Sequence, residues 1–376
     1  MKVAHVTDSL GFGGVETWLL NLVSFSSCKE LGNMVSVIIL TGVIDGPLKP
    51  DFEKLGVKIV RVPFQKGRLL QFAREFRKVI RDEQVDIIHD HQDWVSGLHW
   101  LLTFRLNVVR VSHLHNPKMM IDYYLSNWRR IDRLGFYFLG TLFQCLMSDA
   151  IFSTSKRVLR EYGWLKRMNP FIPVKAMYCG IPRKMSHKDW NAPFLCNAPF
   201  VLFVGRLSMT MGGAFGNQKN PHFAFAVMNE VFKKNDSIQF VVCGETDAEA
   251  SRSCMELISP SLKDRVHILG PRRDVRMMMR HAKCLILPSL QEGLGLVAVE
   301  AQFEGCPVFC SLAVPDEAKV SDNGFVQLPL IEQHWVEGIS ETVGQKKVLL
   351  NCWQNCHMDL ETSSQELLRA YQNWVA

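Results

Sequence analysis

The sequence predicts an α/β protein made of two Rossmann-like, doubly wound domains. Short apolar runs typical of buried strands alternate with longer amphipathic segments typical of helices, over about residues 1–180 and again from about residue 200. The length of 376 residues is enough for two domains of ordinary size. In such domains ligands bind at the carboxyl ends of the strands, so we expect two sheets facing a common cleft.

The expected elements follow from these runs, because strands buried on both faces are continuously apolar. In the first half we expect strands at 3–6, 35–40, 57–62, 87–89, 108–112 and 150–153, and helices at 16–24, 69–81 and 119–147. In the second half we expect strands at 200–204, 240–243, 266–269, 284–287 and 308–310, and helices near 223–235 and at 363–374. A stretch containing Pro and Asn at 182–199 predicts the linker. The predicted domains are therefore 1–185 and 196–358, with 359–376 as a C-terminal helix.

Charge is unevenly divided between the two halves. Residues 1–190 contain 27 Lys and Arg against 17 Asp and Glu, a formal charge of +10, whereas residues 191–376 contain 16 against 20, a charge of −4. A basic first half predicts an anionic partner. The sequence has no nucleic-acid-binding signature, so we expect no nucleic acid. An anionic membrane surface or a lipid-linked diphosphate fits better.

The cellular compartment is indicated by the cysteines and the apolar segments. Eleven cysteines without a Cys-x-x-Cys pair indicate a reducing cytoplasm and no zinc site. Residues 1–8 predict a first strand and not a signal peptide, because the apolar run is short and contains Asp8. The most apolar segment, 134–147, is shorter than the ~20 residues that span a bilayer. We expect a cytoplasmic protein that binds the inner face of the cell membrane peripherally.

The most informative motif runs from Pro288 to Ala301, with the sequence PSLQEGLGLVAVEA. A buried strand ends at Pro-Ser, a loop with two glycines follows, and an apolar helix then begins. Unpaired backbone N–H groups and the helix dipole make such a helix start an anion site. Two carboxylates eight positions apart, Glu292 and Glu300, bracket it. Phosphate and hydroxyl recognition together suit a nucleotide sugar.

This motif resembles the donor-site signature of the retaining glycosyltransferases of family 4, which have the two-domain GT-B fold. The bacterial exopolysaccharide and capsule branch is similar also in GGVE at 13–16, HLHN at 113–116, QKN at 218–220 and VEAQ at 299–302. The resemblance covers about residues 1–330. It implies a C-terminal helix that packs back on the first domain, a nucleotide-sugar co-substrate, and no cofactor or metal.

The resemblance assigns the second carboxylate, Glu300, to the ribose hydroxyls and the first, Glu292, to the donor sugar. The diphosphate would be held by backbone N–H groups of the loop and helix start and by two bases. The loop residues are Gly293, Leu294, Gly295, Leu296 and Val297. The bases are Arg206, which follows Gly205 at a strand end, and Lys219. These cations would stabilise the charge that develops on the leaving diphosphate. Lys219 lies further from Arg206 than the family pattern has it, because of an insert at 209–216 that either gates the cleft or touches the acceptor.

Two further strand ends predict parts of the site. The loop with Gly13 and Gly14 is not a dinucleotide fingerprint, because Glu16 stands in place of the third glycine; it either admits donor phosphate and acceptor or is a plain tight turn. His115, followed by Asn116, resembles the family histidine near the transferred sugar, with His113 as the alternative. Asp90 also lies at a strand end and is a further possible site residue.

The first domain also has two segments suited to an anionic membrane. Residues 119–133 interleave aromatic and basic side chains, and helix 69–81 has basic residues along one face. A solvated helix face is the alternative explanation.

These observations predict a retaining hexosyltransferase that moves a sugar from a nucleotide donor, most simply UDP-linked, to a lipid-linked oligosaccharide or glycan in polysaccharide biosynthesis. The sequence shows no nucleophile for double displacement, and the resemblance implies front-face substitution. Two alternatives stay open: a nucleotide-sugar 2-epimerase of the same fold, and a weakly catalytic sugar-nucleotide-binding partner of a membrane polysaccharide assembly.

Overall fold

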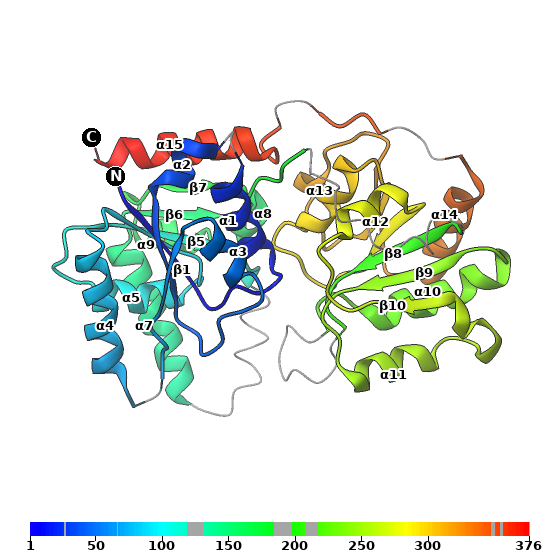
Figure 1. Cartoon of the computed structure of the whole chain (residues 1–376), viewed down its shortest axis with the longest axis horizontal. Coiled ribbons are helices and arrows are strands. Elements are labelled where there is room, and N and C mark those ends of the chain that lie inside the picture. Colours follow the sequence, from blue (N-terminus) through cyan, green and yellow to red (C-terminus); the bar gives the residue numbers. More distant parts are fainter. Residues whose placement is uncertain are drawn as a thin grey trace. The chain divides into compact units, whose positions relative to one another are not determined.

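The computed structural model describes residues 1–25, 28–65, 67–118, 131–183, 198–207, 217–346, 350–353 and 356–375 (Figure 1). The chain divides into two compact units. Unit 1 comprises Met1–Pro182 and His357–Ala376, and unit 2 comprises Arg183–Cys356. Each unit is built on a parallel sheet with helices connecting the strands, which confirms the predicted fold class.

The sheet of unit 1 has seven parallel strands in the order β3-β2-β1-β4-β5-β6-β7. Its strands are β1 (Val3–Thr7), β2 (Val35–Leu40), β3 (Lys58–Arg61), β4 (Ile87–Asp90), β5 (Val109–Leu114), β6 (Ala150–Ser153) and β7 (Val174–Ala176). The order of the strands reverses between β1 and β4, which are neighbours although two strands separate them in the chain. A crevice for ligands forms at such a switch point.

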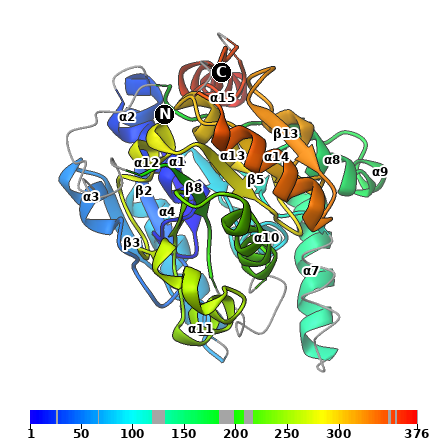
Figure 2. The same cartoon turned by 90° about the vertical axis from the view of Figure 1, so that its right-hand side faces the viewer.

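The helices of unit 1 cover this sheet. They are α1 (Gly14–Ser24), α2 (Lys29–Met34), α3 (Lys49–Lys54), α4 (Leu69–Asp82), α5 (Val95–Leu102), α7 (Ile131–Met147), α8 (Lys156–Glu161), α9 (Trp164–Met168) and α15 (Leu360–Val375). In α4, Phe72, Phe76 and Ile80 recur every four residues and form one buried stripe. They share a core cluster with sheet residues such as Val37 and Ile39. In the turned view of Figure 2, α7 extends past the strands of its sheet.

The sheet of unit 2 has six parallel strands in the order β10-β9-β8-β11-β12-β13. Its strands are β8 (Phe200–Val204), β9 (Gln239–Cys243), β10 (Val266–Ile268), β11 (Cys284–Leu287), β12 (Val308–Ser311) and β13 (Phe325–Leu328). Its helices are α10 (Pro221–Lys234), α11 (Ala248–Glu256), α12 (Val275–His281), α13 (Leu296–Phe303) and α14 (Glu332–Gly344), with 3₁₀ turns η3 (Pro260–Arg265) and η4 (Asp316–Ala318). The switch point lies between β8 and β11, which pair directly.

The C-terminal helix α15 belongs to unit 1, as the predicted fold requires. It contacts α1 and α2, and Tyr371 on it is fully buried. The chain enters this helix beside the end of unit 1, where Ile181 N–H donates to the Met358 carbonyl. The buried Cys28 thiol lies 3.3 Å from the Ser364 hydroxyl of α15.

Several elements differ from the sequence predictions. Strand β5 continues to Leu114 and not only to residue 112, so His113 lies inside the strand. Helix α13 begins at Leu296, directly after Gly295, which takes a left-handed φ of 82° as its N-cap. Strands β7 and β13 were not predicted, since their residues are mostly half-buried and form no continuous apolar run. Residues 119–130, the linker at 184–197 and the insert at 208–216 lie outside the described residues.

Candidate active site

The predicted donor residues of unit 2 follow the two strands that flank its switch point. Arg206 comes two residues after β8, and the loop containing Glu292 follows β11. Lys219 precedes helix α10, the connection that leaves β8. Ligands of doubly wound folds bind at this position. The fold therefore places the three predicted side chains at the edge of the sheet where a ligand is expected.

Lys219 and Glu292 form a direct ion pair although 73 residues separate them. Nζ of Lys219 lies 2.6 Å from Oε1 of Glu292, and the Ser289 hydroxyl donates to the same oxygen over 2.6 Å. The Glu292 side chain is 6% exposed and that of Lys219 is 19% exposed. The two loops are also joined through Gln218, whose carbonyl accepts from Leu290 N–H. A Lys ammonium has three N–H groups, so it can bind Glu292 and still donate to an anion.

Arg206 and Gly205 occupy the end of β8. The Arg206 side chain is 42% exposed and makes a loose ion pair with the exposed Glu245, at 3.5 Å. An incoming anion can displace so exposed a pair at little cost. A β-carbon on Gly205 would lie 2.8 Å from Cγ of Lys219. Glycine at this position therefore lets the Lys219 side chain pass close over the strand end.

The loop before α13 is buried and leads into the helix start. Gly293, Leu294 and Gly295 are buried, and Leu296 and Val297 form the half-buried first residues of the helix. No side chain caps this helix at Gly295. The first N–H groups of a helix lack partners within it, and they favour an anion.

Glu300 lies one turn into α13 and is half-buried. Burial raises the pKa of its carboxyl above the ordinary value, and nearby Arg276 opposes that shift. The Arg276 guanidinium is itself 2.7 Å from Glu304, one further turn along the helix. Arg276 and Glu304 therefore form a buried ion pair beside Glu300.

In unit 1, Gly13 is the N-cap of α1, and Gly14 is the first residue of the helix. The Glu16 carboxylate folds back against this turn: a β-carbon on Gly13 would lie 2.2 Å from Oε2 of Glu16. Burial raises the pKa of Glu16 to about 7, although hydrogen bonds from its own backbone and from Thr7 lower it. A side chain at Gly13 would therefore have to displace the Glu16 carboxylate.

His113 and His115 belong to a layer of five histidines on one face of the unit 1 sheet. Side chains two residues apart on a strand share a face, so His89 and His91 lie together, as do His113 and His115. His5 on β1 pairs in register with His89 on β4. Along one strand the ring centroids are 4.4 Å apart for His89 and His91 and 4.2 Å apart for His113 and His115. Between the neighbouring strands β4 and β5, His89 stacks on His113 with centroids 5.2 Å apart.

These histidines are joined by short contacts between ring nitrogens. His91 contacts His5 through Nε2 and His115 through Nδ1, each over 2.9 Å. His89 contacts Nδ1 of His113 through Nε2 over 3.1 Å, and the Tyr371 hydroxyl of α15 through Nδ1. Burial lowers the pKa of His5 and of His115 to about 3 and holds those of the other three well below the ordinary value. The layer is therefore uncharged at neutral pH.

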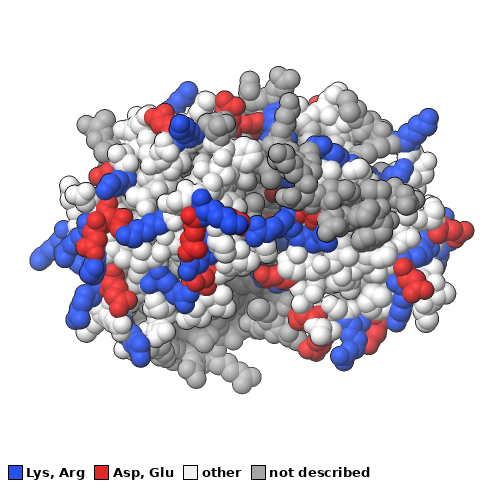
Figure 3. All heavy atoms as spheres, viewed as in Figure 1, with Lys and Arg blue, Asp and Glu red and all other residues white. Residues whose placement is uncertain are grey.

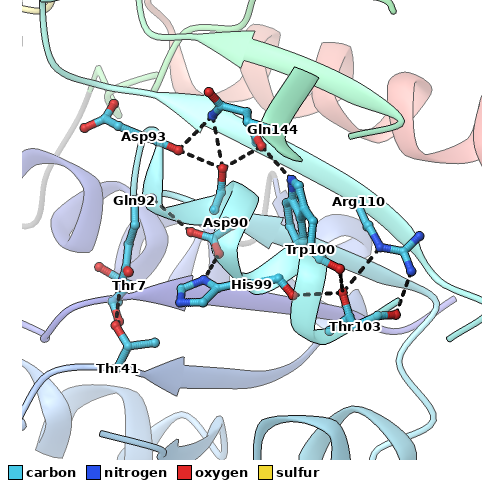
Figure 4. A network of polar contacts seen from close by, with 12 residues as sticks. Thr7, Thr41, Asp90, Gln92, Asp93, His99, Trp100, Thr103, Arg110 and Gln144 are labelled. Carbon is cyan, nitrogen blue, oxygen red and sulfur yellow. Dashed lines mark hydrogen bonds and ion pairs between the residues drawn. The ribbon is translucent and has the colours of Figure 1, made fainter. Parts of the chain in front are cut away.

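Asp90 lies on the opposite face of β4 from these rings. Its carboxylate is fully buried and accepts from His99 Nδ1 over 2.5 Å and from the backbone N–H of Gln92 (Figure 4). Asp90 therefore holds α5 to the sheet and does not point toward His113 or His115.

The loop before α5 fixes His115 through Asp93. Its carboxylate accepts from the backbone N–H of His115 over 2.8 Å and from the Asn116 side chain over 2.7 Å. The Asp93 carbonyl in turn accepts from Gln144 of α7, as Figure 4 shows. The position of His115 is thus set by a network reaching from β4 to α7.

Sequence reasoning did not single out three groups that the structure brings to these sites. They are the anchoring hydroxyl of Ser289, the Arg276–Glu304 pair, and the inner histidines His5 and His89. The spacing of His89 and His91, followed by the same spacing at His113 and His115, was the available signal for the histidine layer. Arg276 and Glu304 offered none, because they come from separate helices.

Two units, each built on a doubly wound parallel sheet, are the arrangement of the GT-B class of glycosyltransferases. Family models agree with this class: the model of Glycosyltransferase Family 4 matches residues 12–183, and that of Glycosyl transferases group 1 matches residues 198–344. Together they account for both units, and the chain belongs to glycosyltransferase family 4, as the sequence motifs predicted.

Individual proteins support the same assignment. The capsular polysaccharide biosynthesis glycosyltransferase CapH of Staphylococcus aureus is 23% identical over 99% of both chains. The Escherichia coli UDP-Gal:α-D-GlcNAc-diphosphoundecaprenol α-1,3-galactosyltransferase is 31% identical over 27% of each chain. Anabaena Alr3699/HepE, solved in complex with UDP-glucose, shares the fold with a TM-score of 0.74 at 16% identity, over 99% of this chain and all of that one. The chain is thus similar to glycosyltransferases of capsule and exopolysaccharide biosynthesis.

The described surface of unit 1 includes only part of the predicted membrane contact. The stretch 119–130 lies outside the described residues, as do the side chains of 131–133. In α4, Arg77 donates to the carbonyls of Leu102 and Phe104, and Lys78 pairs with Asp82. On the face shown in Figure 3, the basic side chains of unit 1 alternate with acidic ones. Among the described residues, no helix combines the length and apolarity needed to cross a bilayer.

Proposed function

We propose that this glycosyltransferase transfers a hexose from a UDP-sugar to a lipid-linked glycan, with retention of the anomeric configuration. The observation that carries the proposal is the ion-paired Lys219 and Glu292 beside the uncapped start of α13, at the switch point of unit 2. Likeness to a UDP-glucose-binding fold and to an enzyme acting on a diphosphoundecaprenol substrate supports the donor and acceptor classes.

In this proposal the chemistry is charge stabilisation at the donor diphosphate. As the glycosidic C–O bond breaks, negative charge grows on the leaving diphosphate. The Lys219 ammonium, oriented by Glu292, donates to that charge, and Arg206 leaves Glu245 to do the same. The backbone N–H groups of Leu296 and Val297, at the start of α13, also donate to the diphosphate. No metal is needed to neutralise the diphosphate.

The remaining donor contacts follow from position along α13. The Glu300 carboxylate, with two oxygens, can accept from both vicinal ribose hydroxyls. Glu292, already engaged by Ser289 and Lys219, is held in place and is poorly suited to act as a free nucleophile. This supports front-face substitution, in which the leaving diphosphate takes the proton of the acceptor hydroxyl.

We further propose that unit 1 docks on an anionic membrane and binds the acceptor there. Large apolar side chains are exposed on α7, including Leu134, Phe138 and Leu146 at 50%, 65% and 61%. The N-terminal 190 residues carry a formal +10, which favours anionic lipid. Cytoplasmic, peripheral association with the inner face of the membrane follows from this proposal.

A transfer assay tests the function. Purified protein is incubated with radiolabelled UDP-sugars and membranes from a polysaccharide-producing strain, and label is measured in the organic-extractable glycolipid. We expect incorporation from one UDP-sugar and at least ~100-fold less with Arg206→Ala, the loss typical of removing one stabilising group. Exposed Arg252→Ala on α11 is the matched control.

The same assay separates the alternatives. A 2-epimerase would convert the UDP-sugar to its epimer without acceptor, which chromatography of the nucleotide fraction detects. A weakly catalytic binding partner would bind the nucleotide yet incorporate no label with any donor, and polymer synthesis in cells would survive Arg206→Ala. Either result would contradict the proposed transfer.

A further inference from the structure

The histidine layer of unit 1 contains more ring nitrogens than its hydrogen bonds use. Five imidazoles are packed at one end of a sheet whose other buried positions are mainly apolar. Trp18 meets four of them edge-on, and Phe152 closes the layer from β6. Nε2 of His5 and Nε2 of His113 are buried without a hydrogen-bond partner of normal geometry among the described residues. An unpaired buried polar group costs about 1–3 kcal/mol, so these positions call for a ligand.

We propose that His91, His113 and His115 bind a divalent transition-metal ion, with Zn²⁺ as the best fit. One ring nitrogen from each of the three lies within 4.8 Å of those of the other two. Three histidines with an open fourth position are a recurrent zinc ligand set. Uncharged imidazole is the form that coordinates such ions. The inference concerns unit 1 and does not depend on the donor chemistry proposed for unit 2.

Between His91 and His115 the geometry requires only a small opening. Nδ1 of His91 and Nε2 of His115 are 2.9 Å apart. Tetrahedral zinc with bonds of ~2.0–2.1 Å keeps its ligand nitrogens about 3.3 Å apart. His115 is half-buried and follows the end of β5, so its ring can shift by this amount, and the ion can enter from that side.

The inner histidines supply the second shell that metal-bound histidines normally have. His91 would use Nδ1 for the ion while its Nε2 contacts His5, and His113 would use Nε2 while its Nδ1 contacts His89. The Met177 carbonyl lies near the His113 ring and favours its protonated form, but it makes no hydrogen bond of normal geometry to Nε2. Such partners fix the tautomer and the ring orientation of each ligand.

A second trio, His5, His89 and His91, also brings its nitrogens within 4.8 Å. It is fully enclosed, because His5 and His89 are completely buried and His91 is only 6% exposed. An ion at this inner position would have no exposed ligand through which to enter. The outer trio is therefore the proposed site, and the two positions predict different responses to substitution.

The test uses the full-length protein stripped with a chelator and equilibrated with Zn²⁺ alone, or with Co²⁺ as a spectroscopic probe. We expect one ion per chain by elemental analysis and the intense visible absorption of tetrahedral Co²⁺. His115→Asn should abolish stoichiometric binding, because it removes a ligand at a half-buried position that tolerates substitution. Exposed His334→Asn on α14, the matched control, should bind one ion. A melting temperature equal to that of the metal-free parent would show that the His115 variant is folded.

His5→Asn distinguishes the two trios. If the outer trio holds the ion, this change removes only a second-shell partner and weakens binding about 10–100-fold. Full binding by His115→Asn together with loss in His5→Asn would overturn the proposed ligand set. Absence of a bound ion in the parent protein would overturn the site altogether.

Discussion

The ion pair between Lys219 and Glu292 should contribute measurably to the stability of unit 2 before any ligand binds. Changing Lys219→Met leaves a carboxylate that is only 6% exposed with Ser289 as its remaining partner. Breaking a buried pair in this way costs about 3–5 kcal/mol. Glu292→Gln should cost less, ~1–2 kcal/mol, because the Lys219 ammonium is more exposed and its stem can turn toward water.

Calorimetry of the single and double variants measures the coupling. At about 2–4 °C per kcal/mol for a unit of this size, Lys219→Met should lower the transition of unit 2 by roughly 6–20 °C. The double variant should be less destabilised than the two single changes added together, by ~1–3 kcal/mol. The same cycle on Lys233 and Glu230, an exposed pair on α10, should show no measurable coupling. Additive effects at Lys219 and Glu292 would refute the pairing.

Three further outcomes are expected. Glu16→Gln should leave the free energy of unfolding unchanged near pH 4 and raise it by ~3 kcal/mol at pH 8. With a pKa of about 7, the folded carboxyl keeps a proton that the unfolded chain loses from about pH 4.5, so the stability of the parent falls as pH rises through this window. A pH-independent difference in urea titrations would contradict this. Gly205→Ala should push Lys219 aside and weaken UDP binding about tenfold in titration calorimetry with the fold intact, whereas unchanged affinity would place Lys219 away from the diphosphate. Tyr371→Phe removes the hydroxyl that His89 contacts and should cost about 1–3 kcal/mol in the transition of unit 1; no change would mean that this contact adds nothing.

The sequence predicted the two parallel sheets well, because their strands depend on local signals. The predicted strands at 35–40, 150–153, 200–204 and 284–287 coincide with β2, β6, β8 and β11. Arg206 was expected at a sheet edge because it comes two residues after a predicted strand, whereas Glu292 was singled out by the motif that follows the strand at 284–287. Short helices such as α2 and α3 were missed, since six residues with one buried side chain each carry too weak a periodicity.

Contacts between distant segments could not be predicted in the same way. The pairing of Lys219 with Glu292 depends on how two loops converge, and the sequence contains no local trace of it. The histidine layer depends on the register of β1, β4 and β5. The motif at 113–116 was noticed, but the continuation of β5 to Leu114, which buries His113, was not. Asp90 lies on the face of β4 opposite His89 and His91, because successive side chains of a strand alternate between the two faces of the sheet.

The most direct test of the central claim is titration calorimetry of the purified protein, without divalent metal, against UDP, GDP and ADP and their common sugar conjugates. The account predicts saturable binding of UDP and one UDP-sugar, at least ~10-fold weaker in Glu300→Gln and unchanged in Glu256→Gln, an exposed glutamate at the end of α11. Binding of no nucleotide, or binding unaffected by Glu300→Gln, would contradict the assignment of the donor site to the start of α13.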